Sequence, residues 1–325
     1  MLDLRKLVLL REIDAHGSIA AAAQSLSYSR SAVSQQITAL EREVGTPLLE
    51  RTSRSVVLTE AARVLVARTE TVLAELEAAE TEIGQTAGTP SGALRIGVSL
   101  NHGPPLLARA LVQVQRRYPR LRITLRGVAA GEGRQAVRLG QLDLVLAFRY
   151  DQVPEPRLPG LLEIPLGSDP IRVAVAADHP LAGTGPRHLA EFAGERWVLR
   201  PASTFGRLTL HACHVAGFEP DAAAELDDLQ AALGLVTAGW AVSLLPDLVP
   251  SRPEFPVARI PLADQRLHRH IAIVVRRGVA GAPAIEALVD EVQAQLIERT
   301  APRPGREAER DLGDSGSRPG PSSPG

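Results

Sequence analysis

Short amphipathic stretches alternate with tight turns at the start of the chain. Apolar residues recur near helical spacing and predict three helices, at 2–16, 19–26 and 30–44. Gly17 and Gly45 end the first and third helix, while Ser18 and Ser29 can cap the second and third. Because about three turn residues join the last two helices, the pattern is typical of a helix-turn-helix. Residues 47–59 then predict a two-stranded wing with a polar tip.

One uninterrupted helical pattern follows over 61–87, with Thr59 as its N-cap. Its apolar residues fall at heptad spacing, which predicts a narrow seam for a partner helix and hence a dimer. The seam consists of two series, Leu65, Val72 and Ala79, and Thr69, Leu76 and Ile83. The alternative is a helix that packs on its own domain.

The pattern changes beyond a linker rich in glycine, threonine, proline and serine, which we place from Gly84 to Gly92. Residues 93–299 alternate short apolar strands with amphipathic helices, which is typical of an α/β fold. From 300 to 325 the chain is rich in proline and glycine and has no aromatic or β-branched residue after Thr300. This tail is predicted to be disordered, because it buries too little apolar surface to offset the entropy of ordering.

Charge and cysteine content narrow the classes of protein. The 325 residues include 36 Lys and Arg against 37 Asp and Glu, and the net charge of −1 excludes a uniformly basic binder and a strongly acidic chain. The single cysteine, Cys213, cannot form an internal disulfide and fits a reducing compartment. No apolar leader follows the N-terminus, and glycines break the uncharged stretch 229–246 into a predicted buried helix and strand. We therefore expect a cytoplasmic protein with no membrane partner.

The outward face of the third helix carries hydrogen-bonding side chains that can reach base edges in a major groove. Together with the capping serine, the set is Ser29, Arg30, Ser31, Ser34, Gln35 and Thr38. Residues 15–40 contain no acid, as a surface that faces phosphates requires. Arg51 and Arg54 at the wing tip are candidate phosphate or minor-groove contacts. The competing interpretation is a polar helical domain without DNA, since residues 1–60 hold seven basic and seven acidic residues.

The segment from Gly17 to Leu65 resembles, without a gap, the DNA-binding pattern of LysR-type transcriptional regulators. Its most specific part is Ala32-Val33-Ser34-Gln35-Gln36-Ile37, followed by Leu40-Glu41. Further landmarks follow in the family's order: Tyr118-Pro119, Gly140-Gln141-Leu142-Asp143-Leu144 and Ala238-Gly239-Trp240-Ala241-Val242-Ser243-Leu244-Leu245-Pro246. The chain departs from the pattern at Leu49, where an aromatic residue is usual, and at Ala62, where glycine is common. Both are core or cap positions, so they hardly weaken the resemblance.

The resemblance implies an α/β fold with an N-terminal, all-α winged helix-turn-helix and a two-lobed effector domain similar to periplasmic solute-binding proteins. The implied parts are a DNA-binding domain at 1–60, a dimerising helix at 61–87, and an effector domain at 92–299. Lobe one is expected at 92–162 and 268–299 and lobe two at 163–267, with two crossings that form a hinge. The expected strands are 94–99, 122–128, 142–148, 172–177, 197–199, 241–245 and 271–276, and the expected helices 105–117, 132–139, 205–216, 228–238 and 283–299.

Ligands of open α/β sheets bind at the carboxyl ends of strands, so the loops there are candidate effector contacts. By resemblance, the set is Ser99, Leu100, Asn101 and His102 after the first strand, Arg149 after the third, and Ser203, Thr204 and Phe205 before a helix of lobe two. Ser99, Asn101 and the following helix N-terminus could hold a carboxylate, and Arg149 could pair with an anion. An anionic effector is therefore the candidate, and the competing interpretation of each residue is an ordinary loop or cap position.

Three other motifs carry less weight. The run Gly131-Glu132-Gly133-Arg134-Gln135-Ala136 matches a dinucleotide-binding fingerprint, but no clear ribose-binding acid or second Rossmann half accompanies it. His211 and His214 share a helix face, yet no second cluster completes a zinc site. No Ser/His/Asp arrangement supports catalysis. We therefore expect no catalytic residue, no metal and no cofactor.

These observations predict a homodimeric or homotetrameric transcriptional regulator that a small molecule controls. Two recognition helices would enter successive major grooves of double-stranded DNA at an imperfect palindrome, and RNA polymerase is a further candidate partner. The alternative is a cytoplasmic solute-binding protein or cleft enzyme whose helical module dimerises without binding DNA. The lack of a leader argues against an exported carrier, and the lack of a convergent acid/base pair argues against an enzyme.

Overall fold

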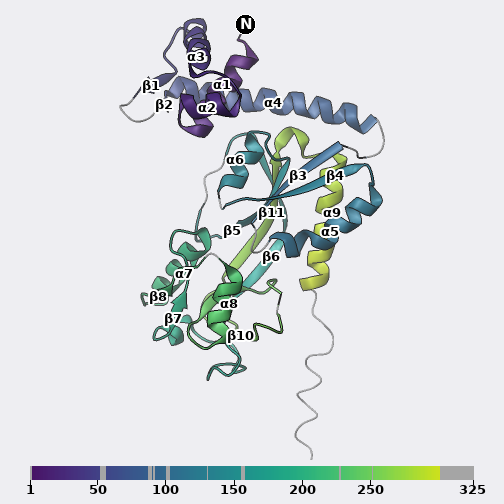
Figure 1. The fold of residues 1–325 in the computed structure, drawn as a ribbon. Helices are drawn as coiled ribbons and strands as arrows, with labels where there is room; N and C mark the ends of the chain where they lie inside the picture. Colours follow the sequence, from purple (N-terminus) through teal and green to yellow (C-terminus); the bar gives the residue numbers. More distant parts are fainter. Residues whose placement is uncertain are drawn as a thin grey trace, which may run out of the picture.

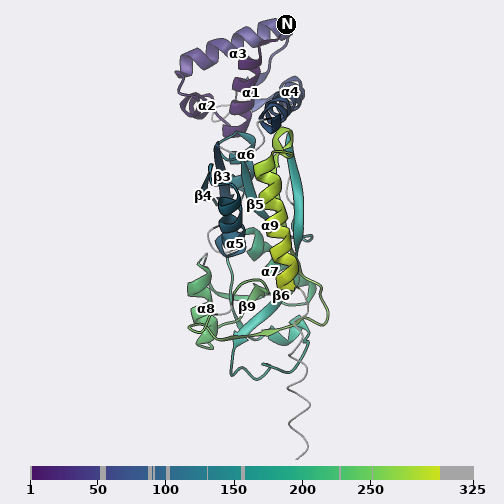
Figure 2. The same ribbon diagram turned by 90° about the vertical axis from the view of Figure 1, so that its right-hand side faces the viewer.

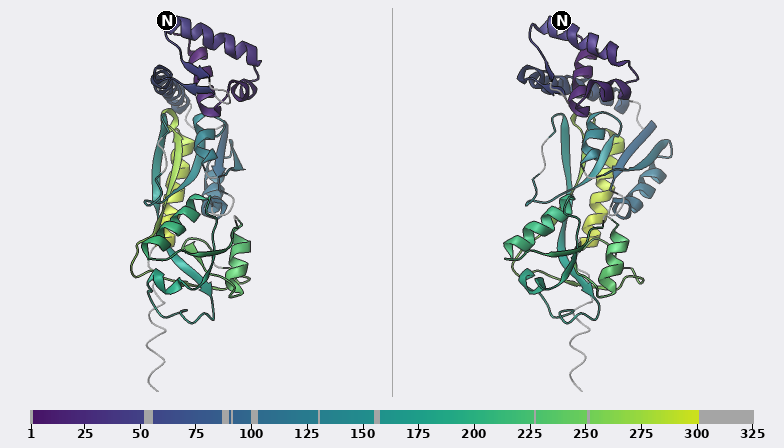
Figure 3. Two further views of the ribbon diagram at one scale, coloured as in Figure 1. Left: turned by 90° about the vertical axis from the view of Figure 1, so that its left-hand side faces the viewer. Right: turned by 60° about the vertical axis from the view of Figure 1, so that its left-hand side comes forward.

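A computed structural model describes residues 2–51, 56–86, 90, 92–99, 103–129, 131–154, 158–226, 228–250 and 252–300. Three parts follow one another along the chain: a helical head, a long helix, and an elongated α/β body with two lobes (Figure 1). The head lies at one end of the molecule and lobe two at the other, also in the further views of Figure 3. The tail from Ala301 on, predicted to be disordered, lies outside the described residues.

The head is a helix-turn-helix with a wing, as predicted. It consists of α1 (Leu4–His16), α2 (Ile19–Ser25), α3 (Arg30–Val44) and the antiparallel strands β1 (Leu49–Arg51) and β2 (Val56–Leu58). Ser18 and Ser29 accept N–H bonds from the first turns of α2 and α3, and Gly17 and Gly45 end α1 and α3 in the left-handed region. The first helix begins at Leu4 rather than at residue 2, because Asp3 serves as its N-cap.

The long helix α4 (Glu60–Thr86) leaves the head and lies across the near end of the body (Figure 1). It continues past Gly84, so the linker start predicted there is wrong. Val72 and Leu76 of the predicted seam are 46% and 49% exposed, which leaves this stripe accessible to a partner. Thr69, predicted to belong to the same seam, is instead 1% exposed, and its hydroxyl donates to the carbonyl of Leu65 (2.7 Å). The helix thus packs one face on its own chain and presents a neighbouring apolar face outward.

One seven-stranded sheet runs through both lobes, in the order β10-β6-β11-β5-β3-β4, with β9 also paired to β6. Its lobe-one strands β3 (Gly92–Val98), β4 (Leu121–Gly127) and β5 (Leu144–Arg149) are parallel, and β9 (Ser243–Pro246) and β10 (Val257–Ile260) lie in lobe two. The long antiparallel strands β6 (Leu161–Ala176) and β11 (His268–Arg276) connect the lobes. The two predicted crossings are therefore a pair of adjacent strands.

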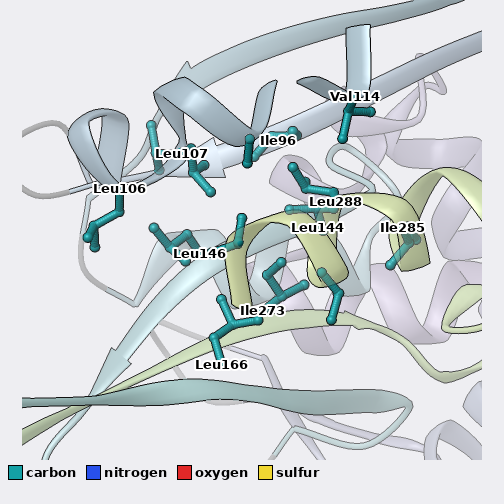
Figure 4. Packing of buried hydrophobic residues seen from close by; sticks show 14 of the residues in the cluster. Ile96, Leu106, Leu107, Val114, Leu144, Leu146, Leu166, Ile273, Ile285 and Leu288 are labelled. Carbon is teal, nitrogen blue, oxygen red and sulfur yellow. The ribbon is translucent and has the colours of Figure 1, made fainter. Parts of the chain in front are cut away.

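Helices cover both faces of the lobe-one part of the sheet. α5 (Gly103–Arg117) and α9 (Pro283–Thr300) pack side by side on one face, where Leu144, Leu288 and their neighbours form a core (Figures 2 and 4). α6 (Glu132–Arg138) packs on the other face, since Val137 and Val145 belong to a separate buried cluster. Successive strand residues point to opposite faces, which explains why Leu144 and Val145 belong to different clusters.

Lobe two has its own core around the fully buried Trp197. Its helices are α7 (Thr204–Val215) and α8 (Leu229–Thr237), and a small parallel pair consists of β7 (Arg196–Val198) and β8 (Asp221–Ala224). Short 3-10 turns, η1 (Leu189–Phe192) and η2 (Arg277–Val279), complete the fold. The uncharged stretch 229–246 forms α8 and β9, in agreement with the predicted helix and strand. Among the described residues, no helix is both long and apolar enough to span a membrane.

The strand β6 is the main departure from the sequence-based prediction. The pattern predicts a strand only from 172, whereas β6 begins at Leu161, because Pro165, Gly167 and Pro170 interrupt its strand signal. Its partner β11 begins at His268 rather than at 271. The four-residue strands β8 and β10 are not predicted at all, since they are too short for a recognisable alternation.

Candidate nucleic-acid interface and effector site

The recognition face of α3 is held outward by the core beneath it. Val33, Ile37 and Leu40 are at most 3% exposed and fix the rotation of the helix. The opposite side then presents the predicted set: Arg30, Ser31 and Gln35 are exposed, and Ser34 and Thr38 are half-buried. The helix N-terminus carries a partial positive charge and unpaired amides, which favour a phosphate there.

The serine at the start of α3 has a structural role that the structure shows directly. The Ser29 hydroxyl accepts the N–H of Ala32 (3.1 Å) and lies 3.0 Å from the Ser31 hydroxyl. This hydrogen bond satisfies one of the free amides in the first turn of α3 and fixes the conformation of that turn. Ser29 is therefore a helix cap, and its contact with DNA stays a prediction.

A shallow hollow on α3 gathers Ser34, Gln35, Thr38 and Arg42. A second hollow, between α3 and the base of the wing, also includes Ser34 and Thr38. Arg42 is an exposed cation that the sequence-based set lacks. It follows Thr38 by four residues, so helical spacing is the signal that would have found it.

The two acids of α3 that follow this face are bonded to other parts of the head. The Glu41 carboxylate accepts the backbone N–H of Leu48 (2.9 Å) and that of Leu49 (3.3 Å), which ties the helix to the wing. Glu43 pairs with Lys6 of α1. Both carboxylates thus stabilise the head itself. Neither lines the hollow formed by Ser34, Gln35, Thr38 and Arg42, whereas Glu41 lines the second hollow beside Ser34 and Thr38.

The two strands of the wing are formed, and its tip lies outside the described residues. β1 pairs with β2 in the register Leu49 to Leu58 and Arg51 to Val56. The side chain of Arg51 and the whole of Arg54 lie outside the described residues. Their contacts with phosphate stay predictions.

The predicted effector residues of lobe one share one edge of the sheet. Because β3 and β5 are parallel, Ser99, which follows β3, and Arg149, the last residue of β5, both lie at the carboxyl edge. The Arg149 guanidinium is half exposed and lies 4.0 Å from the carboxylate of Glu163. Leu100, Asn101 and His102 lie outside the described residues.

The lobe-two residues lie at the start of α7, beside the connection between the lobes. The Ser203 hydroxyl accepts the N–H of Gly206 (2.9 Å) and caps the helix, and Thr204 and Phe205 are half-buried in its first turn. The ring of Phe205 lies 5.7 Å from that of Tyr150, which directly follows Arg149. The structure thus brings the first turn of α7 close to the end of β5.

The glycine-rich run at the start of α6 and the cysteine of α7 have structural roles. The run 131–136 forms the start of α6, where Gly133 packs against Val145. Cys213 lies fully buried in α7, where burial, assisted by Glu219, raises the pKa of its thiol to about 12. No group of three potential metal ligands occurs among the residues that the structure describes.

Comparison with known proteins places both parts of the chain. A family model described as "LysR substrate binding domain" matches residues 87–297, and one described as "Bacterial regulatory helix-turn-helix protein, lysR family" matches residues 4–63. The DNA-binding transcriptional dual regulator OxyR of Escherichia coli (strain K12) is 30% identical over 297 residues, which cover 90% of this chain and 95% of OxyR. A hydrogen peroxide-inducible genes activator of Pectobacterium carotovorum subsp. carotovorum is 31% identical and covers 90% of this chain and 96% of its own. The crystal structure of full-length BenM matches with a TM-score of 0.56 at 27% identity, covering 94% of this chain and 100% of BenM.

Proposed function

Because the chain belongs to the LysR family of bacterial transcriptional regulators, we propose that its head binds duplex DNA through α3 and the wing, under the control of a small molecule between the lobes. The observation that carries the proposal is the outward face of α3: it presents hydrogen-bonding side chains, while Glu41 accepts backbone amides of the wing and Glu43 pairs with Lys6. The relatives support a regulator with an effector-binding domain and give no support to a solute carrier or a cleft enzyme.

In this proposal, some side chains of α3 contact bases and the others position the helix on the DNA. Gln35 has the amide geometry to pair with adenine, and Arg30 can reach guanine or phosphate. Ser31, Ser34 and Thr38 are short and fix the depth of the helix in the groove. Arg51 and Arg54 of the wing, with Arg42 of α3, supply phosphate contacts that hold the register.

The protein acts as a homo-oligomer in this proposal. The exposed stripe of α4, marked by Val72 and Leu76, supplies the apolar surface that a second α4 would bury. A two-fold pair of heads then meets two half-sites of an imperfect palindrome about 34 Å apart, one turn of DNA. RNA polymerase is the further partner of such a regulator, and the cytoplasm is its site of action.

The effector is proposed to be a small anion at the carboxyl edge of the lobe-one strands. Ser99 and Arg149 at this edge, with Ser203, Thr204 and Phe205 of α7, are the proposed contacts, together with Leu100, Asn101 and His102. One relative is named as an activator of hydrogen peroxide-inducible genes, but this chain has a single, buried cysteine. A reversible ligand rather than oxidation of a thiol pair therefore suits this chain.

Gln35→Ala tests base recognition. Each good amide-to-base pair contributes about 1–3 kcal/mol of discrimination, so the variant should lose roughly tenfold or more in preference for the selected site over random DNA. Binding constants on both DNAs are measured by gel shift, with Gln36→Ala, outside the proposed face, as the matched control. Equal loss on both DNAs for Gln35→Ala would contradict base recognition, and failure of the wild-type protein to shift any genomic fragment would overturn the DNA-binding role itself.

Arg51→Ala combined with Arg54→Ala tests the wing. If each arginine contacts a phosphate, the slope of log K against log salt should become shallower by about 0.9 per contact, on specific and random DNA alike. An unchanged slope would remove the wing arginines from the phosphate contacts.

A further inference from the structure

A buried arginine joins three separate elements at the contact between head and body. Arg138, the last residue of α6, is only 3% exposed. Its Nε donates to Glu70 of α4 (2.6 Å), and its Nη1 donates to Asp14 of α1 (3.0 Å). One guanidinium therefore holds the first helix of the head and the long helix against lobe one. Figure 1 shows α6 directly beneath the head and α4.

Close backbone contacts fix α4 in the same place. A β-carbon added at Gly278 of η2 would lie 2.0 Å from the carbonyl oxygen of Ala74, and one added at Gly160 would lie 2.7 Å from the Glu70 carboxylate. Arg276 adds a second ion pair to α4, with Glu77, and donates to two carbonyls of lobe one at 3.0 Å. Lobe one and α4 therefore pack closely against each other, with backbone in direct contact and two ion pairs between them.

The other end of α6 lies at the effector edge. The helix follows β4, whose carboxyl end shares an edge with the ends of β3 and β5 because the three strands are parallel. Arg134 in the middle of α6 contacts the Glu163 carboxylate at 3.3 Å, and Arg149 approaches the same carboxylate at 4.0 Å. Ion contacts thus run from a proposed effector residue to α6, and from α6 to the head.

We propose that α6 transmits the state of the effector site to the DNA-binding head, with Arg138 as the positioning residue that holds α1 and α4. This inference rests on the proposed function and concerns the regulation of the same site. A two-turn helix moves as a unit, so a change in the contact of Glu163 with Arg134 displaces the Arg138 guanidinium, one turn further along α6. Because Arg138 binds both Asp14 and Glu70, its displacement alters the angle between the head and the body.

The chemistry of the contact makes it sensitive to small displacements. The Nη2 of Arg138 is buried and has no hydrogen-bond partner among the described residues. Burial raises the pKa of Glu70 even though Arg138 opposes the shift, so the ionised pair lies in a poorly solvated place. Charged pairs in such places depend strongly on their separation, because water does not screen them.

A double-mutant cycle tests the connection without knowledge of the effector. Glu163→Gln acts at the effector end and Glu70→Gln at the head end, and both keep the size of the side chain. Independent sites with no shared partner add within about twofold in a binding constant. We expect the combined variant to depart from additivity by about fivefold or more in DNA affinity, within the usual range of allosteric coupling.

A matched control separates transmission from a general loss of charge. Glu191→Gln removes a carboxylate from the lobe-two pair with Arg187 (3.4 Å), away from α6, and should combine additively with Glu70→Gln. Arg138→Lys keeps the charge but loses the two-pronged geometry, and should change the DNA bend measured by circular permutation. Additivity of Glu163→Gln with Glu70→Gln, or a wild-type bend in Arg138→Lys, would overturn the inference.

Hydrogen exchange provides a readout that needs no DNA. Glu163→Gln should speed exchange of the α1 amides severalfold, and Glu191→Gln should leave it unchanged. If wild-type protein shifts DNA but the effects are additive and exchange in α1 is unaffected, only the transmission through α6 fails. If the wild-type protein binds no DNA, the proposed function fails, and hydrogen exchange alone decides whether α6 couples the two ends.

Discussion

Arg138 and Arg276 hold α4 and the head on lobe one through ion pairs, whereas two continuous strands, β6 and β11, join lobe one to lobe two. Ion pairs between separate elements are the kind of contact that repacks when two bodies rotate against each other. The second bends within a sheet, and the register of its strands shifts between Ile271 and Ala272, where a β-bulge breaks the regular pairing. The head connection therefore resembles an interface between rigid bodies, and the lobe connection resembles a hinge.

Each connection contains a buried arginine, which makes the comparison direct. Arg269 of β11 is 1% exposed, pairs with Asp169 of β6, and lies over the ring of Phe148 with its guanidinium carbon 4.6 Å from the ring centre. Asp169 also accepts the N–H of Leu248 (2.9 Å). The partners of Arg269 are neighbours on paired strands, whereas those of Arg138 belong to different parts of the molecule. The same side chain thus reinforces one sheet in the first case and joins separate bodies in the second.

The largest expected effects come from removing either arginine. Arg138→Met and Arg269→Met each leave a buried carboxylate without its cation, so each should lower the free energy of unfolding by about 3–5 kcal/mol. Urea unfolding measures this loss. Only Arg138→Met should also change the DNA bend, because only its partners belong to the head and α4. A changed bend in Arg269→Met with a normal bend in Arg138→Met would reverse the assignment of the two connections.

Gly278→Ala should produce the next largest effect. The added methyl group would meet the Ala74 backbone at 2.0 Å, so α4 must move away from η2. Overpacking of this kind costs about 1–3 kcal/mol. The thermal midpoint of unfolding measures the loss, and Gly194→Ala is the control, because no atom lies within 4 Å of the added carbon there. Similar midpoints for the two variants would show that η2 and α4 are not in tight contact.

Local sequence signals were sufficient to predict the helices of the head. They were insufficient to predict the contacts that connect the head to lobe one and lobe one to lobe two. Ser29 and Gly45 delimit α3 with interactions three or four residues away, so the sequence pattern predicts its bounds correctly. The pairs of Arg138 with Glu70 and of Arg269 with Asp169 join residues 68 and 100 positions apart, and no local pattern reports them. The early start of β6 has the same cause, since its pairing with β11 decides the strand despite Pro165 and Gly167.

The predicted site residues also fall into those that the sequence could place together and those that only the structure could. Ser31, Ser34, Gln35 and Thr38 could be placed together because helical spacing alone defines their face. Ser99 and Arg149 could be placed at one edge once parallel strands were assumed. The contact between Phe205 and Tyr150 depends on how α7 packs beside the end of β5, so it required the structure.

Two helix caps, one in the head and one in lobe two, allow a matched comparison with smaller expected effects. Ser29 caps α3 and Ser203 caps α7 through the same hydroxyl-to-amide bond, 3.1 Å and 2.9 Å long. Removal of an N-cap costs about 1 kcal/mol, so Ser29→Ala and Ser203→Ala should destabilise the protein by similar amounts in thermal unfolding. Only Ser29→Ala should also weaken DNA binding, because only α3 is proposed to enter the groove. Equal DNA affinity of both variants would indicate that the first turn of α3 stays away from DNA.

Hydrogen peroxide is expected to have no effect on DNA affinity, because Cys213 should not be oxidised. Nucleophilic attack on peroxide requires the thiolate, and a thiol with a pKa of about 12 is almost entirely protonated at neutral pH. Burial in α7 also blocks approach to the sulfur. Treatment with hydrogen peroxide should therefore leave DNA affinity unchanged, and native protein should resist alkylation until it is unfolded. A peroxide-dependent change in the gel shift that disappears in Cys213→Ser would show that α7 opens and exposes this thiol.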